Sequence, residues 1–119
     1  MNNKVDIVDS EVKTAYSDCH EFKAGPRNLD FRASESVSVE DAVAIMEKYV
    51  PGYNDFRPEL LWQLPKDVEV VIAREGSVCL YLSLPEGFDN MDTFDCIRTN
   101  LKCDECSVEE CGEIRVWWD

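Results

Sequence analysis

Hydrophobic and polar residues alternate most regularly over residues 67–84, DVEVVIAREGSVCLYLSL. Apolar side chains recur at every second position on both sides of Glu75-Gly76. This period of two predicts β-strands, and a glycine-containing break between two such runs predicts a hairpin turn. The same period returns in residues 113–118, EIRVWW. We therefore expect a last strand there that pairs with the hairpin.

Three other stretches have apolar residues at helical spacing. Residues 39–50 follow Ser38 in the pattern Ser-x-x-Asp, which is typical of a helix N-terminal cap. Pro51-Gly52 ends this helix, because a proline disfavours the α conformation in the residue before it. Residues 58–64 predict a shorter helix between two prolines. A third helix is predicted over residues 91–102.

The first 36 residues have a weaker pattern. Residues 4–8 and 11–16 each alternate over a few positions, which predicts two short strands. Residues 20–36 contain a Gly-Pro pair and little periodicity, so they are expected to be mostly irregular. The apolar residues expected to anchor this irregular stretch are Phe22, Leu29 and Phe31.

These elements predict a small α+β fold, with residues 1–119 forming a single domain. Its antiparallel sheet would consist of the hairpin at 67–84 and the C-terminal strand at 113–118, with the helices packed on one face. A length of 119 residues lies in the usual range for one domain, and 45 % hydrophobic residues is ordinary for a globular protein.

The charge of the chain restricts its partners. There are 25 Asp and Glu residues against 12 Lys and Arg, giving a net charge of −13. Nucleic-acid phosphates and anionic membranes repel such a chain, so direct binding to either is disfavoured. The expected partner is a basic protein that itself binds nucleic acid. The sequence has no signal-peptide pattern and no run of roughly 18 apolar residues, so a cytoplasmic location is expected.

The acidic excess is large between residues 86 and 119, where ten acids face three bases. Three aspartates recur there at every third position, which on a helix places neighbours about 5–6 Å apart. That spacing approaches the ~7 Å between phosphates along a nucleic-acid strand. A solvated acidic face that maintains solubility is the simpler alternative. The residues predicted to contact a partner are Asp89, Asp92, Asp95, Asp104, Glu105, Glu109, Glu110 and Trp117.

The six cysteines leave three possibilities open: a zinc site, disulfides or free thiols. Cys103-x-x-Cys106 is one ligand pair of the type found in structural zinc sites, and Cys96 and Cys111 are near enough in sequence to complete a set of four. A zinc-stabilised protein–protein adaptor is therefore the alternative function. Because only one such pair is present, and because a reducing compartment favours thiols, we expect free thiols and no metal.

Enzyme chemistry is not indicated, so no catalytic residue and no cofactor is predicted. His20 is the single histidine, and no phosphate-binding loop, nucleophile elbow or two-histidine metal motif occurs. Acids surround Cys103 and Cys106 and are expected to raise the pKa of their thiols, which argues against a thioredoxin-type activity. The aspartates between residues 89 and 95 lack the glycine and terminal Glu of a calcium loop.

The predicted function is that of a small inhibitor that occludes a basic, nucleic-acid-binding surface, by nucleic-acid mimicry. In size, acidity and lack of active-site motifs the chain is similar to phage anti-CRISPR and antirestriction proteins and to toxin-neutralising immunity proteins. Trp117 and Trp118 fall on opposite faces of the last strand, so one can enter the core while the other anchors a partner. Residues 103–111 are expected to form an exposed acidic surface, with Lys102 as the one nearby base.

Overall fold

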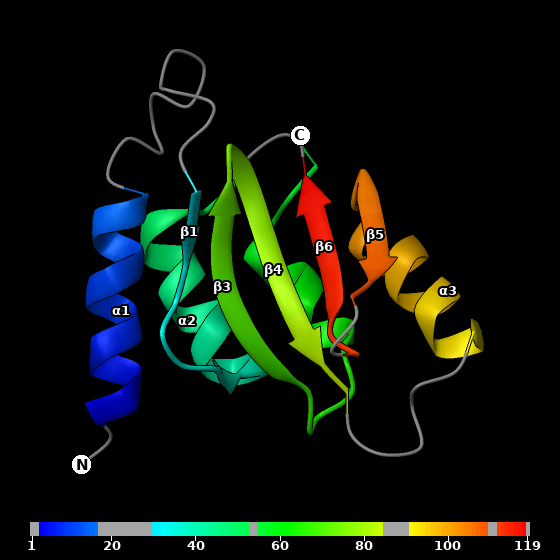
Figure 1. Ribbon diagram of the computed structural model, residues 1–119, viewed down its shortest axis with the longest axis horizontal. Helices are drawn as coiled ribbons and strands as arrows, with labels where there is room; N and C mark the ends of the chain where they lie inside the picture. The colour runs from blue at the N-terminus through cyan, green and yellow to red at the C-terminus, as the bar shows by residue number, and fades with distance from the viewer. Residues whose placement is uncertain (1–2, 17–29, 53–54, 85–90, 110–111, 119) are drawn as a thin grey trace.

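The computed structural model describes residues 3–16, 30–52, 55–84, 91–109 and 112–118, and for residue 3 and residues 91–93 it describes the backbone alone. The strands in these residues are β1 (Asp30–Arg32), β2 (Val37–Ser38), β3 (Glu69–Glu75), β4 (Ser77–Ser83), β5 (Glu105–Val108) and β6 (Ile114–Trp118). They form one antiparallel sheet in the order β1-β3-β4-β6-β5, with β2 also paired to β3 (Figure 1). The predicted hairpin, the predicted last strand and the α+β class are confirmed.

The hairpin has the turn that its sequence predicts. Glu75 pairs with Ser77, and Gly76 between them has a φ of 73°. A glycine adopts this left-handed conformation without the steric cost that a side chain would add. β6 continues the sheet from β4, with Leu80 opposite Val116. β6 is the last of these strands in the sequence, yet it lies inside the sheet between β4 and β5.

The described helices are α1 (Asn3–Ala15), α2 (Val39–Tyr49), the 3-10 helix η2 (Pro58–Gln63) and α3 (Met91–Leu101). The last three confirm the helices predicted from sequence. Ser38 caps α2 as expected, since its side-chain oxygen accepts a hydrogen bond from the Asp41 amide at 3.1 Å. α1 packs against α2, and η2 packs against both α2 and α3. The placement of all helices on one face of the sheet stays a prediction.

The prediction of two short strands before residue 17 is wrong, because α1 occupies both segments. The buried residues Val8, Val12, Ala15 and Tyr16 are spaced by four, three and one positions, which is the stripe of a helix. Ile7, one of the residues that suggested alternation, is 48 % exposed. The short alternations in residues 4–8 and 11–16 are therefore parts of one helical pattern.

A polar contact fixes α1 on α2. The Asp9 carboxylate accepts hydrogen bonds from Lys48 Nζ and from the Tyr49 hydroxyl, each at 2.6 Å. These contacts lower the pKa of Asp9 below its ordinary value of 3.8, with the Lys48 hydrogen bond as the main cause. Two helices far apart in sequence thus share an ionised carboxylate at their contact.

The predicted irregular stretch of residues 20–36 is corrected at its end, where β1 pairs with β3. Phe31 lies in β1 and packs against the core, half-buried, while Phe22 and Leu29 lie outside the described residues. The sequence of β1 gives no alternation of its own, because the strand is only three residues long and is specified by its partner.

Trp118 closes one end of the hydrophobic core. Its side chain is 0 % exposed, and its ring meets the edge of Phe56 with centroids 4.7 Å apart. The Trp118 indole N–H donates to the Leu101 carbonyl at 3.0 Å, so β6 is attached to the last residue of α3. The buried residues from α1 to β6 form one contiguous cluster. Among the helices in the described residues, none is long and apolar enough to cross a membrane.

Candidate binding surface

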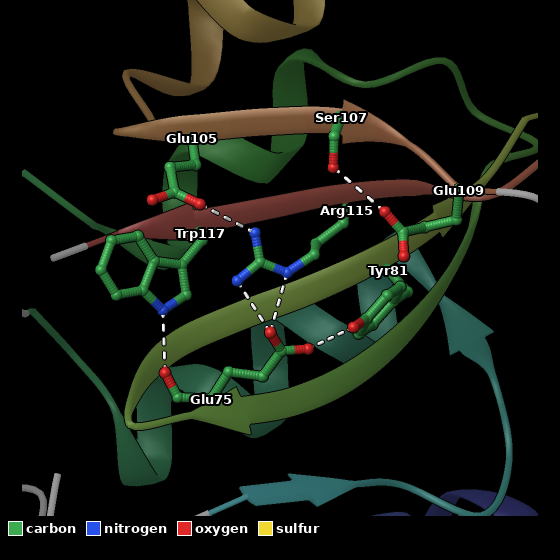
Figure 2. A network of polar contacts seen from close by, with 7 residues as sticks. All are labelled: Glu75, Tyr81, Glu105, Ser107, Glu109, Arg115 and Trp117. Atoms are coloured by element: carbon green, nitrogen blue, oxygen red, sulfur yellow. Dashed lines mark hydrogen bonds and ion pairs between the residues drawn. The ribbon is translucent and has the colours of Figure 1, made fainter. Parts of the chain in front are cut away.

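Strand pairing places Trp117 on the face of the sheet opposite Trp118. Across β6, Trp117 lies opposite Cys79 of β4 and Glu105 of β5, and Arg115 lies opposite Tyr81. Directly paired residues point to the same side of a sheet. Figure 2 shows the resulting network, which we call the Arg115 face; it consists of Glu75, Tyr81, Glu105, Ser107, Glu109, Arg115 and Trp117.

Arg115 occupies the centre of this face between carboxylates from two strands. Its guanidinium contacts the Glu75 carboxylate with Nη2 at 2.7 Å and Nε at 2.8 Å, and it contacts Glu105 with Nη1 at 3.1 Å. The Arg115 side chain is 18 % exposed, so solvent screens these contacts only in part. One base therefore forms ion pairs with one acid from β3 and one from β5.

Glu75 and Tyr81 share a hydrogen bond that sets their protonation. Burial alone would raise the pKa of Glu75, but hydrogen bonds from Arg115 and Tyr81 lower it overall. Burial and the bond to Glu75 both raise the pKa of Tyr81. At neutral pH the carboxyl group is therefore ionised and the hydroxyl is protonated. Neither group is poised to exchange a proton near pH 7.

Trp117 is half-buried, and its one polar atom already has a partner. The indole N–H donates to the Glu75 carbonyl at 3.0 Å, which carries the ring across β4 toward the end of β3. The Arg115 guanidinium lies 6.0 Å from the ring centroid. The different burial of Trp117 and Trp118 is as predicted from their alternation. The ring of Trp117 therefore has no free side-chain hydrogen-bond donor.

The predicted acidic residues fall into two groups. Asp104, Glu105 and Glu109 lie in or beside β5, with the first two exposed and the third half-buried. Glu109 accepts a hydrogen bond from the Ser107 hydroxyl at 3.1 Å. Asp95 lies exposed on α3, away in sequence from this group. Asp89 and Glu110 lie outside the described residues, and Asp92 is described by its backbone alone.

The segment between α3 and β6 was expected to be an exposed surface with Lys102 as its single nearby base. It instead contains β5, and β6 brings Arg115 directly against Glu105. Glu105 is therefore part of an ion pair. Sequence reasoning missed Glu75, Tyr81 and Arg115 as members of the surface. The available clue was a charged residue, Arg115, in a strand that is otherwise apolar.

The pKa values of the Cys103 and Cys106 thiols, near the start of β5, differ in part from those expected. The pKa of Cys103 is lowered, where neighbouring acids were expected to raise it. The main cause is a hydrogen bond from the Cys106 thiol, and the positive charge of Arg98 adds to it, while Asp104 opposes it. The pKa of Cys106 is raised by the same hydrogen bond and by burial. The two thiols thus act as one donor and one acceptor.

The zinc alternative stays a prediction. Cys96 is exposed on α3, while Cys103 and Cys106 are half-buried at the start of β5. In the part of the chain that the structure describes, no three Cys, His, Asp or Glu side chains are arranged to hold a metal ion. Cys111, the fourth ligand in the predicted set, lies outside that part.

Comparison with protein-family models, with curated proteins and with solved structures finds no match to this chain. The Arg115 face combines two carboxylates that are ion-paired to one guanidinium with a partly exposed aromatic ring.

Proposed function

We propose that the protein is a small, non-catalytic inhibitor that binds a basic, nucleic-acid-binding surface of another protein. The observation that supports this proposal is the position of three predicted contact residues on one face. Glu105 is the direct cross-strand neighbour of Trp117, and Glu109 follows on the same strand segment. Trp, Tyr and Arg are the residue types enriched among those that carry most of the binding energy of protein–protein interfaces.

The charge of the face suits a basic partner. Glu75, Glu105 and Glu109 outnumber Arg115, and the whole chain adds a net charge of −13. Long-range attraction of this kind accelerates encounter with a positive surface and weakens as salt is added. The carboxylates would compete with nucleic-acid phosphates for the same lysines and arginines. We place this competition in the cytoplasm.

Contacts that restrain the acidic side chains of the Arg115 face add to the proposed affinity. Glu105 is held by Arg115, and Glu109 is held by Ser107. Side chains that are already fixed lose less conformational entropy when they bind. The sheet beneath them is built from the buried strands β3, β4 and β6, so it presents these groups on a rigid support.

The test begins with capture of a partner from a host lysate, followed by competition. The captured protein should be displaced by a DNA or RNA duplex, and its association rate should fall as salt rises from low to moderate concentration. Glu105→Gln combined with Glu109→Gln should slow association by roughly tenfold or less, since both acids belong to the Arg115 face. Trp117→Ala should instead raise the dissociation rate. The expected loss of binding free energy is about 2 kcal/mol.

The matched control removes two exposed acids elsewhere, Glu59→Gln and Asp67→Asn. It makes the net charge less negative by the same amount and should leave the association rate near that of the unmodified protein. If both double variants slow association to the same extent, net charge alone is responsible and the Arg115 face is not the contact. An association rate that does not respond to salt would exclude charge-driven capture altogether.

A further inference from the structure

β5 is an edge strand of the sheet formed by the described residues. In the described residues it pairs with β6 on one side and with no strand on the other (Figure 1). An edge of this kind presents backbone N–H and C=O groups that can accept a further strand. Its use depends on which residues turn those groups outward.

The hydrogen-bond pattern identifies these residues as Cys106 and Val108. The Glu109 amide donates to the Glu113 carbonyl at 2.7 Å, so this is a hydrogen-bonded pair of the antiparallel ladder. Such pairs alternate with non-hydrogen-bonded pairs. Ser107 is therefore bonded to Arg115 across the ladder, whereas Cys106 and Val108 direct their backbone groups away from β6. No described residue donates to or accepts from these outward groups.

Side chains along the same edge alternate in character. Val108 is 62 % exposed, and it lies on the opposite face from Glu105, Ser107 and Glu109. A strand placed beside β5 would meet acids on one face and an exposed valine on the other. A second copy of this chain would set acids against acids, because its own β5 carries the same residues, and both copies have a net charge of −13.

We propose that β5 pairs with an extended basic segment of the partner protein, in an antiparallel sense, and so extends the sheet by one strand. This inference rests on the proposed function and specifies what the partner contributes. Backbone hydrogen bonds to Cys106 and Val108 supply affinity, and side chains at alternate positions supply specificity. The segment carries basic residues opposite Glu109 and Glu105, four positions apart, and an apolar residue opposite Val108. Read along the segment, its pattern is basic, apolar, any, any, basic.

The probe is a synthetic peptide of about ten residues with this pattern, blocked at both ends. Two N-methylated versions distinguish strand pairing from charge attraction. Methylation of the amides opposite Cys106 and Val108 removes the donors that face β5. Methylation of the amide opposite Ser107 alters a group that faces away. We expect the first to weaken binding by roughly tenfold or more and the second to have little effect.

A protein variant tests the same contact from the other side. Val108→Pro removes an outward N–H and leaves the ladder to β6 intact, since proline is tolerated on an edge strand where its missing N–H faces solvent. It should lose peptide binding to a similar degree. Val108→Thr keeps the amide and should retain most of the affinity. A circular dichroism spectrum and a thermal midpoint near those of the unmodified protein confirm that each variant is folded.

Equal binding of both methylated peptides would overturn strand pairing and leave charge-driven capture in place. Failure of the patterned peptide to bind at low salt, with the captured partner still displaced by a DNA duplex, would overturn this inference while the proposed function stands. Equal binding of a peptide with Glu in place of both basic residues would overturn the basic specificity. Dimer formation by the protein, lost in Val108→Pro, would make a second copy the occupant and also overturn it.

Discussion

Trp117 and Trp118 are consecutive residues of β6, and the sheet directs their side chains to opposite faces. Both indole N–H groups donate to backbone carbonyls at 3.0 Å, one to Glu75 and the other to Leu101. The rings differ in what surrounds them. Trp118 is enclosed by core residues such as Phe56, whereas Trp117 lies among polar side chains and is only half-buried. The same residue type therefore stabilises the fold on one face and shapes a surface on the other.

The largest expected effect is a difference in folding stability between alanine substitutions at Trp118 and at Trp117. Trp118→Ala removes a fully buried ring and should cost about 3–5 kcal/mol in the free energy of unfolding, measured in urea by circular dichroism. Trp117→Ala should cost about 1–2 kcal/mol, because its ring is partly exposed already. If Trp118→Ala does not fold, Trp118→Phe and Trp117→Phe provide the comparison: each loses its indole hydrogen bond, and Trp118→Phe also leaves a cavity in the core, so it should lose more stability. Equal losses at both positions would contradict the difference in their surroundings.

A smaller effect is expected on the Arg115 face, where Glu75 should make the folding stability depend on pH. The pKa of Glu75 is lowered below its ordinary value of 4.5, so folding favours its ionised form. This stabilisation is complete above about pH 4.5 and is lost as pH falls through the lowered value. Glu75→Gln should therefore be less stable than the unmodified protein by about 1 kcal/mol at pH 7, and the difference should shrink toward pH 3.

Glu59→Gln, at an exposed position on η2, is the control for that experiment. Its stability should follow that of the unmodified protein across the pH range. A difference between Glu75→Gln and the unmodified protein that stays constant from pH 7 to pH 3 would mean that the Arg115 contact does not favour the ionised carboxylate.

The smallest effect concerns the rates at which two cysteines react with an alkylating reagent. Cys79 lies opposite Trp117, is fully buried and has a raised pKa, with burial as the main cause. Cys103 is half-buried and has a lowered pKa. Iodoacetamide at neutral pH should therefore label Cys103 well before Cys79, as read by mass spectrometry of peptides. Cys106→Ala should slow labelling of Cys103 several-fold, because it removes the hydrogen bond that stabilises the thiolate. Unchanged labelling would show that this bond is not made in solution.

Sequence reasoning succeeded for elements that carry their own local pattern. The hairpin has apolar residues at every second position from Val68 to Ile72 and from Val78 to Leu84, and α2 follows a capping serine and ends shortly before Pro51. It failed for α1, where windows of five and six residues suggested strands, and the helical period is visible only over the whole segment. It also missed β1 and β5, which are three and four residues long. Strands this short exist because a neighbour pairs with them, and their own sequences do not indicate it.

The Arg115 face was predicted only in part, for a related reason. Alternation in EIRVWW was enough to separate Trp117 from Trp118. The network around Arg115 needed the order of the strands, because Glu75 and Glu105 are far apart in sequence and meet only across β6 and β4. The lowered pKa of Cys103 likewise depends on the placement of the Cys106 thiol and of Arg98, which residue type and spacing alone do not fix.

The interior position of β6 has a consequence for how the chain reaches its fold during synthesis. A nascent chain extended only as far as Leu101 can form the hairpin, but β4 then ends the sheet with an unpaired and largely apolar edge. That edge is covered only when residues 114–118 have left the ribosome and inserted between β4 and β5. Exposed strand edges promote aggregation in partly folded chains. Chaperone demand during translation should therefore be greatest between completion of the hairpin and emergence of the last strand.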